Sequence, residues 1–152
     1  METRKLQIEH LERRIKLFPP LTSITTPPLG WVKAIRSALG ISLQQIAKRL
    51  SITKQSVKEI ELREQEGTIT LNSLREVARS LDMELVYAFV PKDGSLSGLI
   101  DRKAREMATT IVQRASNTMK LEDQENSGQR VQRAIEERVS ELKNEMPKTL
   151  WD

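Results

Sequence analysis

Four long polar side chains lie close together near the start of a predicted helix: Lys54, Gln55, Lys58 and Glu59. Amino, amide and carboxylate groups of this kind exchange hydrogen bonds with the edges of DNA bases. Val57 and Ile60 occupy the other, apolar side of the same helix, so the four polar groups face outward. A helix with an apolar inner stripe and long hydrogen-bonding side chains near its start fits the major groove. The spacing therefore favours recognition of double-stranded DNA.

The segment from Ser42 to Glu61 predicts two helices joined by a short turn, which would position these side chains. Ser42 and Gln45 have the spacing of a capping box, which satisfies free N–H groups at the start of the first helix. Thr53 can cap the second helix in the same way. The apolar face of the first helix consists of Leu43, Ile46, Ala47 and Leu50. The sequence thus predicts a helix-turn-helix.

Ser51 lies in the predicted turn, at a position that usually takes glycine because the chain enters the left-handed region there. Other residues lose roughly 1–2 kcal/mol in that conformation, and a plain pair of packed helices is the alternative interpretation. The distribution of charge supports DNA binding. Residues 1–62 carry 11 Lys and Arg against 5 Glu, whereas residues 63–152 carry 14 basic against 16 acidic residues. The excess of positive charge lies in the half that contains the predicted helix-turn-helix, as contact with DNA phosphates requires.

The composition limits the class of protein. With 152 residues, of which 38% are hydrophobic and 3% aromatic, a large independent core is not expected, and oligomerisation would add stability. The chain has no cysteine, which excludes disulfides and thiolate chemistry. The longest apolar run, Leu85 to Val90, is too short to cross a membrane, and the charged stretch from Met1 to Phe18 is unlike a secretory signal. We expect a soluble, cytoplasmic protein with no membrane partner.

Proline and glycine divide the chain into predicted parts. Residues 1–29 are expected to form an N-terminal helix, over about Thr3 to Leu17, and a proline-rich linker. Residues 30–82 form the helix-turn-helix DNA-binding domain, residues 83–91 a dimerisation strand, and residues 95–152 a C-terminal helical region. The predicted fold class is mainly α: a lambda-repressor-like helix-turn-helix bundle with one β-strand and C-terminal helices.

Two more helices complete the predicted bundle. The first is ended by Gly40, and its apolar residues are Trp31, Ile35, Ala38 and Leu39. Thr70 is expected to cap the last helix. The inner face of that last helix is expected to carry Leu71, Leu74, Ala78 and Leu81.

The segment from Met83 to Val90 is rich in β-formers and apolar on both faces, so it predicts a strand. A single strand cannot satisfy its ladder of hydrogen bonds, and no second strand of comparable strength exists in the sequence. Antiparallel pairing with the same strand of a second copy would satisfy it. A buried final helix turn, or pairing with the region of Ile24, are the alternatives.

Beyond Leu96 the spacing of apolar residues returns to that of helices. One apolar stripe continues to Met119, and a last helix carries Val131, Ile135, Val139, Leu142 and Met146 inward. A helix as long as the first is unusual in a small globule and suits packing on a partner. The two helices could equally fold back on each other. The sequence leaves open whether Trp151 docks on its own chain or on a partner.

Enzymatic chemistry has no support in the sequence. The single histidine, His10, lies on a charged helix, and without cysteine neither a zinc site nor a histidine-based triad can form. No glycine-rich phosphate loop is present, since Gly94 and Gly98 lack the required lysine. We therefore predict no catalytic residue, no metal site and no cofactor.

Segments spread along the chain resemble the "mobile mystery protein A" family of bacterial helix-turn-helix proteins. They are GWVKAIRSALG (Gly30–Gly40), the helix-turn-helix, GTITLNSLREVARSLDMELVYAFVP (Gly67–Pro91), TMKLEDQ (Thr118–Gln124) and the terminal LWD. The resemblance implies a neighbouring gene for a Fic-domain protein. Such a pair looks like a toxin–antitoxin or mobile-element module in which this chain is the DNA-binding member.

The resemblance also implies roles for residues of the helix-turn-helix. Base contact would fall on Lys54, Gln55 and Glu59, with three adjacent residues, Thr53, Ser56 and Lys58. Phosphate contact would fall on Ser42, Gln44 and Gln45, at the positive start of the preceding helix.

The expected function is that of a homodimeric DNA-binding repressor, an antitoxin-like regulator of its own operon. The alternative is an interaction protein that neutralises a Fic-type enzyme through its C-terminal helices. Antitoxins that block Fic enzymes often carry Ser/Thr-x-x-x-Glu-Gly/Asn. Leu62–Gly67 and Leu121–Asn126 match the end of this pattern but begin with leucine, which disfavours direct inhibition through either segment.

Overall fold

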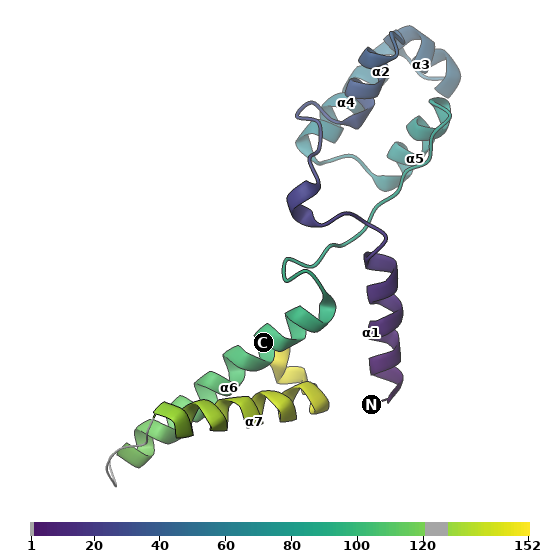
Figure 1. Cartoon of the computed structure of the whole chain (residues 1–152). Coiled ribbons are helices and arrows are strands. Elements are labelled where there is room, and N and C mark those ends of the chain that lie inside the picture. Colours follow the sequence, from purple (N-terminus) through teal and green to yellow (C-terminus); the bar gives the residue numbers. More distant parts are fainter. Residues whose placement is uncertain (1, 121–127) are drawn as a thin grey trace. The chain divides into compact units, whose positions relative to one another are not determined.

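The computed structural model describes residues 2–120 and 128–152, and these are mainly helical (Figure 1). The chain divides into two compact units. One unit comprises Ser23–Tyr87, here called the central unit, and the other comprises Met1–Thr22 together with Ala88–Asp152, here called the terminal unit. None of the described helices combines the length and the hydropathy that a bilayer crossing requires.

The central unit is built from short helices around one small core. Their bounds are Trp31–Ala38 (α2), Leu43–Leu50 (α3), Lys54–Glu66 (α4) and Leu71–Ser80 (α5), after a short 3-10 helix at Leu21–Ser23 (η1) that begins in the terminal unit. The core is formed by Val32, Ile46, Ala47, Val57, Val77 and Leu81. Ala47 is fully buried where α3 packs against its neighbours. A small residue is needed at this position, because a larger side chain would hold the helix backbones apart.

Helix boundaries in this unit follow from the capping residues. Ser42 Oγ accepts a hydrogen bond from the Gln45 backbone N–H, and Gln45 Oε1 accepts one from the Ser42 N–H, so the predicted capping box is confirmed. The hydroxyl groups of Thr53 and Thr70 accept from the third residue of α4 and α5 respectively, as expected. Ser51 has φ 55°, in the left-handed region, where glycine would be less strained.

Two inner faces differ from the sequence prediction. Trp31 and Leu39 are 52% and 59% exposed, and Val32 is the buried residue of α2. In α5 the buried residue is Val77, whereas Leu71 is exposed. Trp31 and Leu71 are the first residues of their helices, where the core does not reach them. The spacing of apolar residues along a helix shows which residues share a face. It does not show whether the first turn of that helix extends beyond the core.

Two carboxylates of α4 bind α2 within the central unit. Glu61 is 6% exposed and forms an ion pair with Arg36, whose Nε and Nη2 atoms lie 2.5 and 3.2 Å from its two oxygens. Glu64 accepts hydrogen bonds from the backbone N–H groups of Trp31 and Val32, at 2.7 and 3.0 Å. Since Gly30 has no side chain to cap α2, Glu64 supplies the missing acceptor.

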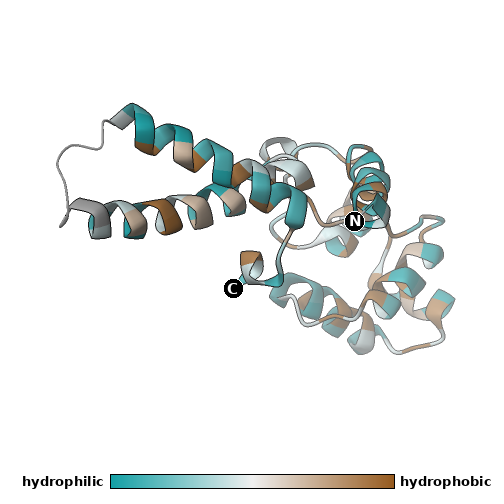
Figure 2. Cartoon of the chain, turned by 90° about the horizontal axis from the view of Figure 1, so that it is seen from below, coloured by the Kyte–Doolittle hydropathy of each residue, from teal (hydrophilic) through white to brown (hydrophobic). Residues whose placement is uncertain are grey.

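The terminal unit is a pair of long helices with a further helix packed on it. The helices are Glu2–Ile15 (α1), Leu96–Lys120 (α6), Gly128–Glu145 (α7) and the 3-10 helix Lys148–Trp151 (η2). Polar and apolar residues alternate along α6 and α7, which lie side by side (Figure 2). The core between them contains Ile100, Ala104, Ala108, Ile135, Val139, Leu142 and Leu150.

Ion pairs on the surface also join α6 to α7. Asp101 lies 2.6 Å from Lys143, and Arg105 binds Glu136. Hence the alternative in which the two C-terminal helices fold on each other is the one observed. Leu150, rather than Trp151, anchors the tail: Leu150 is buried, whereas Trp151 is 48% exposed.

Helix α1 packs on α6. Ile8 lies against the core of the terminal unit. Glu12 Oε1 accepts hydrogen bonds from both the backbone N–H and the hydroxyl of Ser97, each at 2.7 Å. These bonds, the hydroxyl first, lower the pKa of Glu12 below its ordinary value. The carboxylate therefore caps the free N–H groups at the start of α6.

The segment Met83–Val90, called the connecting segment below, joins α5 to α6 (Figure 1). The described residues contain no β-strand, so the predicted strand remains without a partner in a single chain. The alternative of a buried final helix turn is wrong, since the segment is not helical and Phe89 is 92% exposed. Pairing with a second copy remains a prediction.

Candidate nucleic-acid interface

The start of α4 presents the polar side chains that the sequence singled out. Lys54, Gln55, Lys58 and Glu59 are all exposed. Within the described part of the chain, no hydrogen bond or ion pair occupies any of these four side chains. Their donors and acceptors are therefore available to an external ligand.

The position around the helix decides which of these groups points most directly outward. Successive residues of an α-helix are about 100° apart, so Gln55 lies roughly 160° around the axis from Val57. Val57 is fully buried, and so the Gln55 amide projects almost directly away from the core. Glu59, one turn further along, lies on the same outer face. Lys54 and Lys58 lie nearer its margin, where a phosphate backbone would flank a helix in a groove.

Thr53 and Ser56 serve mainly to begin α4. Thr53 Oγ1 accepts the Ser56 backbone N–H at 3.0 Å, and the two hydroxyl oxygens lie 2.8 Å apart. Ser56 is partly buried. These hydroxyls are occupied by each other and by the helix end, so they hold Lys54 and Gln55 in place at the start of α4.

The start of α3 carries the other predicted group. Ser42 and Gln45 are exposed but bonded to each other through the capping box, whereas Gln44 is exposed and has no such bond among the described residues. The backbone N–H groups of Leu43 and Gln44 likewise lack a protein acceptor in the described ranges. Free N–H groups at the positive end of a helix attract an anion such as phosphate.

The turn holds α3 and α4 in one arrangement. The backbone N–H of Ile52 donates to the carbonyl of Ala47 at 3.0 Å, which closes the end of α3 around Ser51. Arg49 donates from Nη1 to the Ser80 carbonyl at 2.6 Å and so ties α3 to the end of α5. Side chains on α3 and α4 are consequently carried on a rigid support, as a recognition surface requires.

The surface lies in a stretch of the sequence free of acidic residues. No Asp or Glu occurs between Glu12 and Glu59. Within this stretch, α3 and the start of α4 contribute Lys48, Arg49, Lys54 and Lys58. The predicted site omitted Lys48, which is exposed in the last turn of α3 and adds to the positive charge. The absence of carboxylates between Glu12 and Glu59 is the sequence feature that could have added Lys48 to the predicted site.

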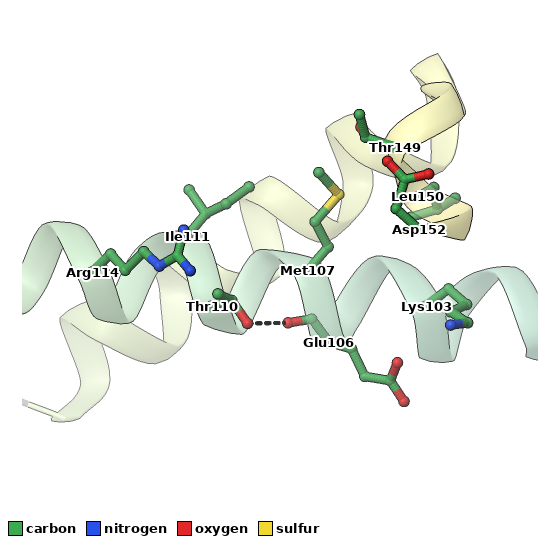
Figure 3. Close-up of a pocket in the computed structure, with 9 residues that line it drawn as sticks. All are labelled: Lys103, Glu106, Met107, Thr110, Ile111, Arg114, Thr149, Leu150 and Asp152. Atoms are coloured by element: carbon green, nitrogen blue, oxygen red, sulfur yellow. Dashed lines mark hydrogen bonds between the residues drawn. The ribbon is translucent and has the colours of Figure 1, made fainter.

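Other features of the described residues offer less chemistry. They contain no group of three or more His, Cys, Asp or Glu side chains that could hold a metal ion. An open groove of about 300 Å³ runs along α6 beside the chain end in the terminal unit (Figure 3). The residues that line it are Lys103, Glu106, Met107, Thr110, Ile111, Arg114, Thr149, Leu150 and Asp152.

Of the two segments compared with the Fic-inhibitory pattern, Leu121–Asn126 lies outside the described residues. In the other, Glu66 is the exposed last residue of α4, followed by Gly67 with φ 76°.

No protein-family model, curated protein or solved structure matches this chain.

Proposed function

We propose that this protein binds double-stranded DNA sequence-specifically and regulates transcription, as a repressor of its own operon. The observation that carries this proposal is the start of α4, where Lys54, Gln55, Lys58 and Glu59 are exposed and unoccupied on a capped helix. Long polar side chains held rigidly on one helix are suited to hydrogen bonding with base edges.

The pair α3 and α4, with its tight turn at Ser51, has the order of elements of a lambda-repressor-like helix-turn-helix. In that arrangement α4 enters the major groove as the recognition helix and α3 lies across the phosphate backbone. Gln55 and Glu59 would contact bases together with Lys54. Lys58 and Lys48 would contact phosphates, and the free N–H groups of Leu43 and Gln44 would bind a phosphate at the start of α3.

The protein would act as a homodimer, because regulators of this kind bind two half-sites about 34 Å apart, one turn of DNA. The connecting segment supplies a means of pairing, since Val86, Tyr87 and Phe89 are exposed and no backbone group from Glu84 to Val90 is bonded to another described group. A Val86→Pro exchange should weaken the dimer by removing a backbone donor.

Footprinting on the DNA upstream of the protein's own gene tests the proposal. We expect protection of one site with two-fold symmetry by the intact protein. A variant with Lys54, Gln55 and Lys58 replaced by alanine should fold normally, because all three side chains are exposed, and should protect nothing. Equal protection by both proteins would remove α4 from the DNA interface.

A second candidate function is binding of a Fic-domain partner by the terminal unit. It is favoured by two apolar side chains that remain exposed in that unit, Ile111 at 36% and Trp151 at 48%. Ile111 lines the groove of Figure 3. Trp151→Ala should lower co-purification of the neighbouring Fic-type protein. Trp31→Ala is the matched control, because Trp31 is equally exposed but lies in the central unit. Equal yields for both variants would argue against docking at the chain end.

A further inference from the structure

The connecting segment exposes both apolar side chains and backbone groups. Val86, Tyr87 and Phe89 are 77%, 57% and 92% exposed. From Glu84 to Val90, no backbone N–H or carbonyl has a hydrogen bond to another described group. A run of apolar residues with an unpaired backbone is a template for pairing with another strand. The described residues with positive φ all lie outside the segment, so its backbone can adopt strand geometry.

Two opposite charges flank the segment and suggest what pairs with it. Glu84 lies at its beginning, and Lys92 lies just beyond its end, as the first inner residue of the turn that the Gly94 N–H closes on the Pro91 carbonyl at 3.0 Å. Both charged side chains are exposed. Neither forms an ion pair with any other described residue. A strand with an acid at one end and a base at the other is complementary to an antiparallel copy of itself. In a parallel pair, by contrast, like charges would face each other.

We propose that two copies of the chain form an antiparallel β-ribbon through this segment, with Ala88 facing Ala88 of the second copy on the two-fold axis. This inference rests on the homodimer proposed above and specifies its interface. In this register Glu84 faces Lys92 of the second copy, and Tyr87 faces Phe89 of the second copy. Both kinds of facing pair stabilise a sheet, the charges by attraction and the rings by aromatic contact.

The register also accounts for Pro91. Residues of an antiparallel pair alternate between positions that bond to the partner strand and positions whose backbone groups point outward. If Val86, Ala88 and Val90 take the bonded positions, Pro91 falls on an outward one. Its missing N–H then removes no bond.

Neighbouring registers lack these matches. Centring the pair on Val86 would set Glu84 against Ala88 and Tyr87 against Leu85, which leaves the charges and the two rings without facing partners. Shifting the axis by one residue exchanges the two faces of the strand. The axis at Ala88 alone joins the opposite charges and the two aromatic rings at once.

Cysteine crosslinking tests the register directly, because the chain contains no other cysteine. Under mild oxidation in the absence of DNA, full-length Ala88→Cys should form a disulfide-linked dimer. Val86→Cys is the matched control. Two copies of residue 86 would be separated by four strand positions, roughly 14 Å, which is beyond the ~7 Å that a disulfide spans. Crosslinking that peaks at residue 86 or 87 would overturn the register.

Charge reversal provides an independent test by sedimentation. Glu84→Lys and Lys92→Glu should each raise the dimer dissociation constant roughly tenfold, since each sets like charges together twice in the dimer. The double variant should return it to within about twofold of the original. A dimer that survives both single reversals overturns the ribbon while leaving the homodimer intact. A monomer at all micromolar concentrations overturns both, but not DNA binding, which the footprint tests separately.

Discussion

The central and terminal units use their charged side chains differently. In the terminal unit, surface charges join neighbouring helices: Asp101 to Lys143, Arg105 to Glu136. In the central unit the paired charges lie toward the interior, where Glu61 meets Arg36, and those at the start of α4 are unpaired. Exposed ion pairs contribute little to stability, and a charged side chain that is already paired is less available to a ligand. The ion pairs of the terminal unit therefore say little about function. The unpaired, rigidly held polar groups are the more informative feature.

The largest effect is expected from breaking the interior pair of the central unit. Arg36→Met should lower the free energy of unfolding by about 3 kcal/mol, because Glu61 would keep a buried charge without its partner. Arg63→Met, an exposed position on α4, should change it by less than about 0.5 kcal/mol.

Urea unfolding followed by the fluorescence of Trp31, in a Trp151→Phe background, measures this effect in the central unit. If the two variants proved equally stable, Arg36 and Glu61 would not be what holds α2 on α4.

A smaller effect, on DNA affinity alone, is expected at the unpaired surface. Gln55→Ala should weaken binding to a specific site by ~1–3 kcal/mol and leave binding to random DNA nearly unchanged, as for a base-edge contact. Gln113→Ala, exposed on α6 in the terminal unit, should alter neither. Gel-shift titrations on both DNAs measure the difference. Equal losses on specific and random DNA would reassign Gln55 to backbone contact.

The smallest effect concerns the terminal unit and depends on pH. The pKa of Glu12 is lowered from 4.5 by hydrogen bonds from Ser97, so the folded chain binds the proton of Glu12 less tightly than the unfolded chain. The stability that Glu12 contributes is complete above the pKa that Glu12 has in the unfolded chain. It is lost as the pH falls through the lower pKa that Glu12 has in the folded chain. Glu12→Gln should therefore cost ~1 kcal/mol at neutral pH, as loss of a helix cap does, and progressively less in acid.

Circular dichroism during urea unfolding at a series of pH values provides the measurement, with Glu9→Gln as the control, because Glu9 is an exposed residue of α1 whose side chain forms no hydrogen bond to another described residue. A difference between Glu12→Gln and the original protein that stays constant down to pH 2 would show that the carboxylate is not the relevant group.

The helix caps and the turn could be predicted from the sequence, because the residues that interact in them are close together along the chain. The capping box of Ser42 with Gln45, the cap at Thr53 and the left-handed turn at Ser51 all depend on residues within four positions. The outward placement of Lys54 and Gln55 followed from the same short-range periodicity.

What the sequence did not reveal depends on distant partners. Glu61 and Glu64 look like ordinary surface residues of α4 until Arg36 and the start of α2 are placed beside them. The contact of α1 with α6 joins Glu12 to Ser97, which lies 85 residues further along the sequence. Such pairings are set by tertiary packing, which spacing along one helix does not encode.

The central claim is that the start of α4 reads a DNA sequence, and selection from a random pool of duplexes tests it without assuming any operator. The intact protein should enrich one sequence with two-fold symmetry and half-site centres about one turn apart. The variant with alanine at Lys54, Gln55 and Lys58 should enrich none. Failure of the intact protein to enrich any sequence, or enrichment of the same sequence by the variant, would contradict it.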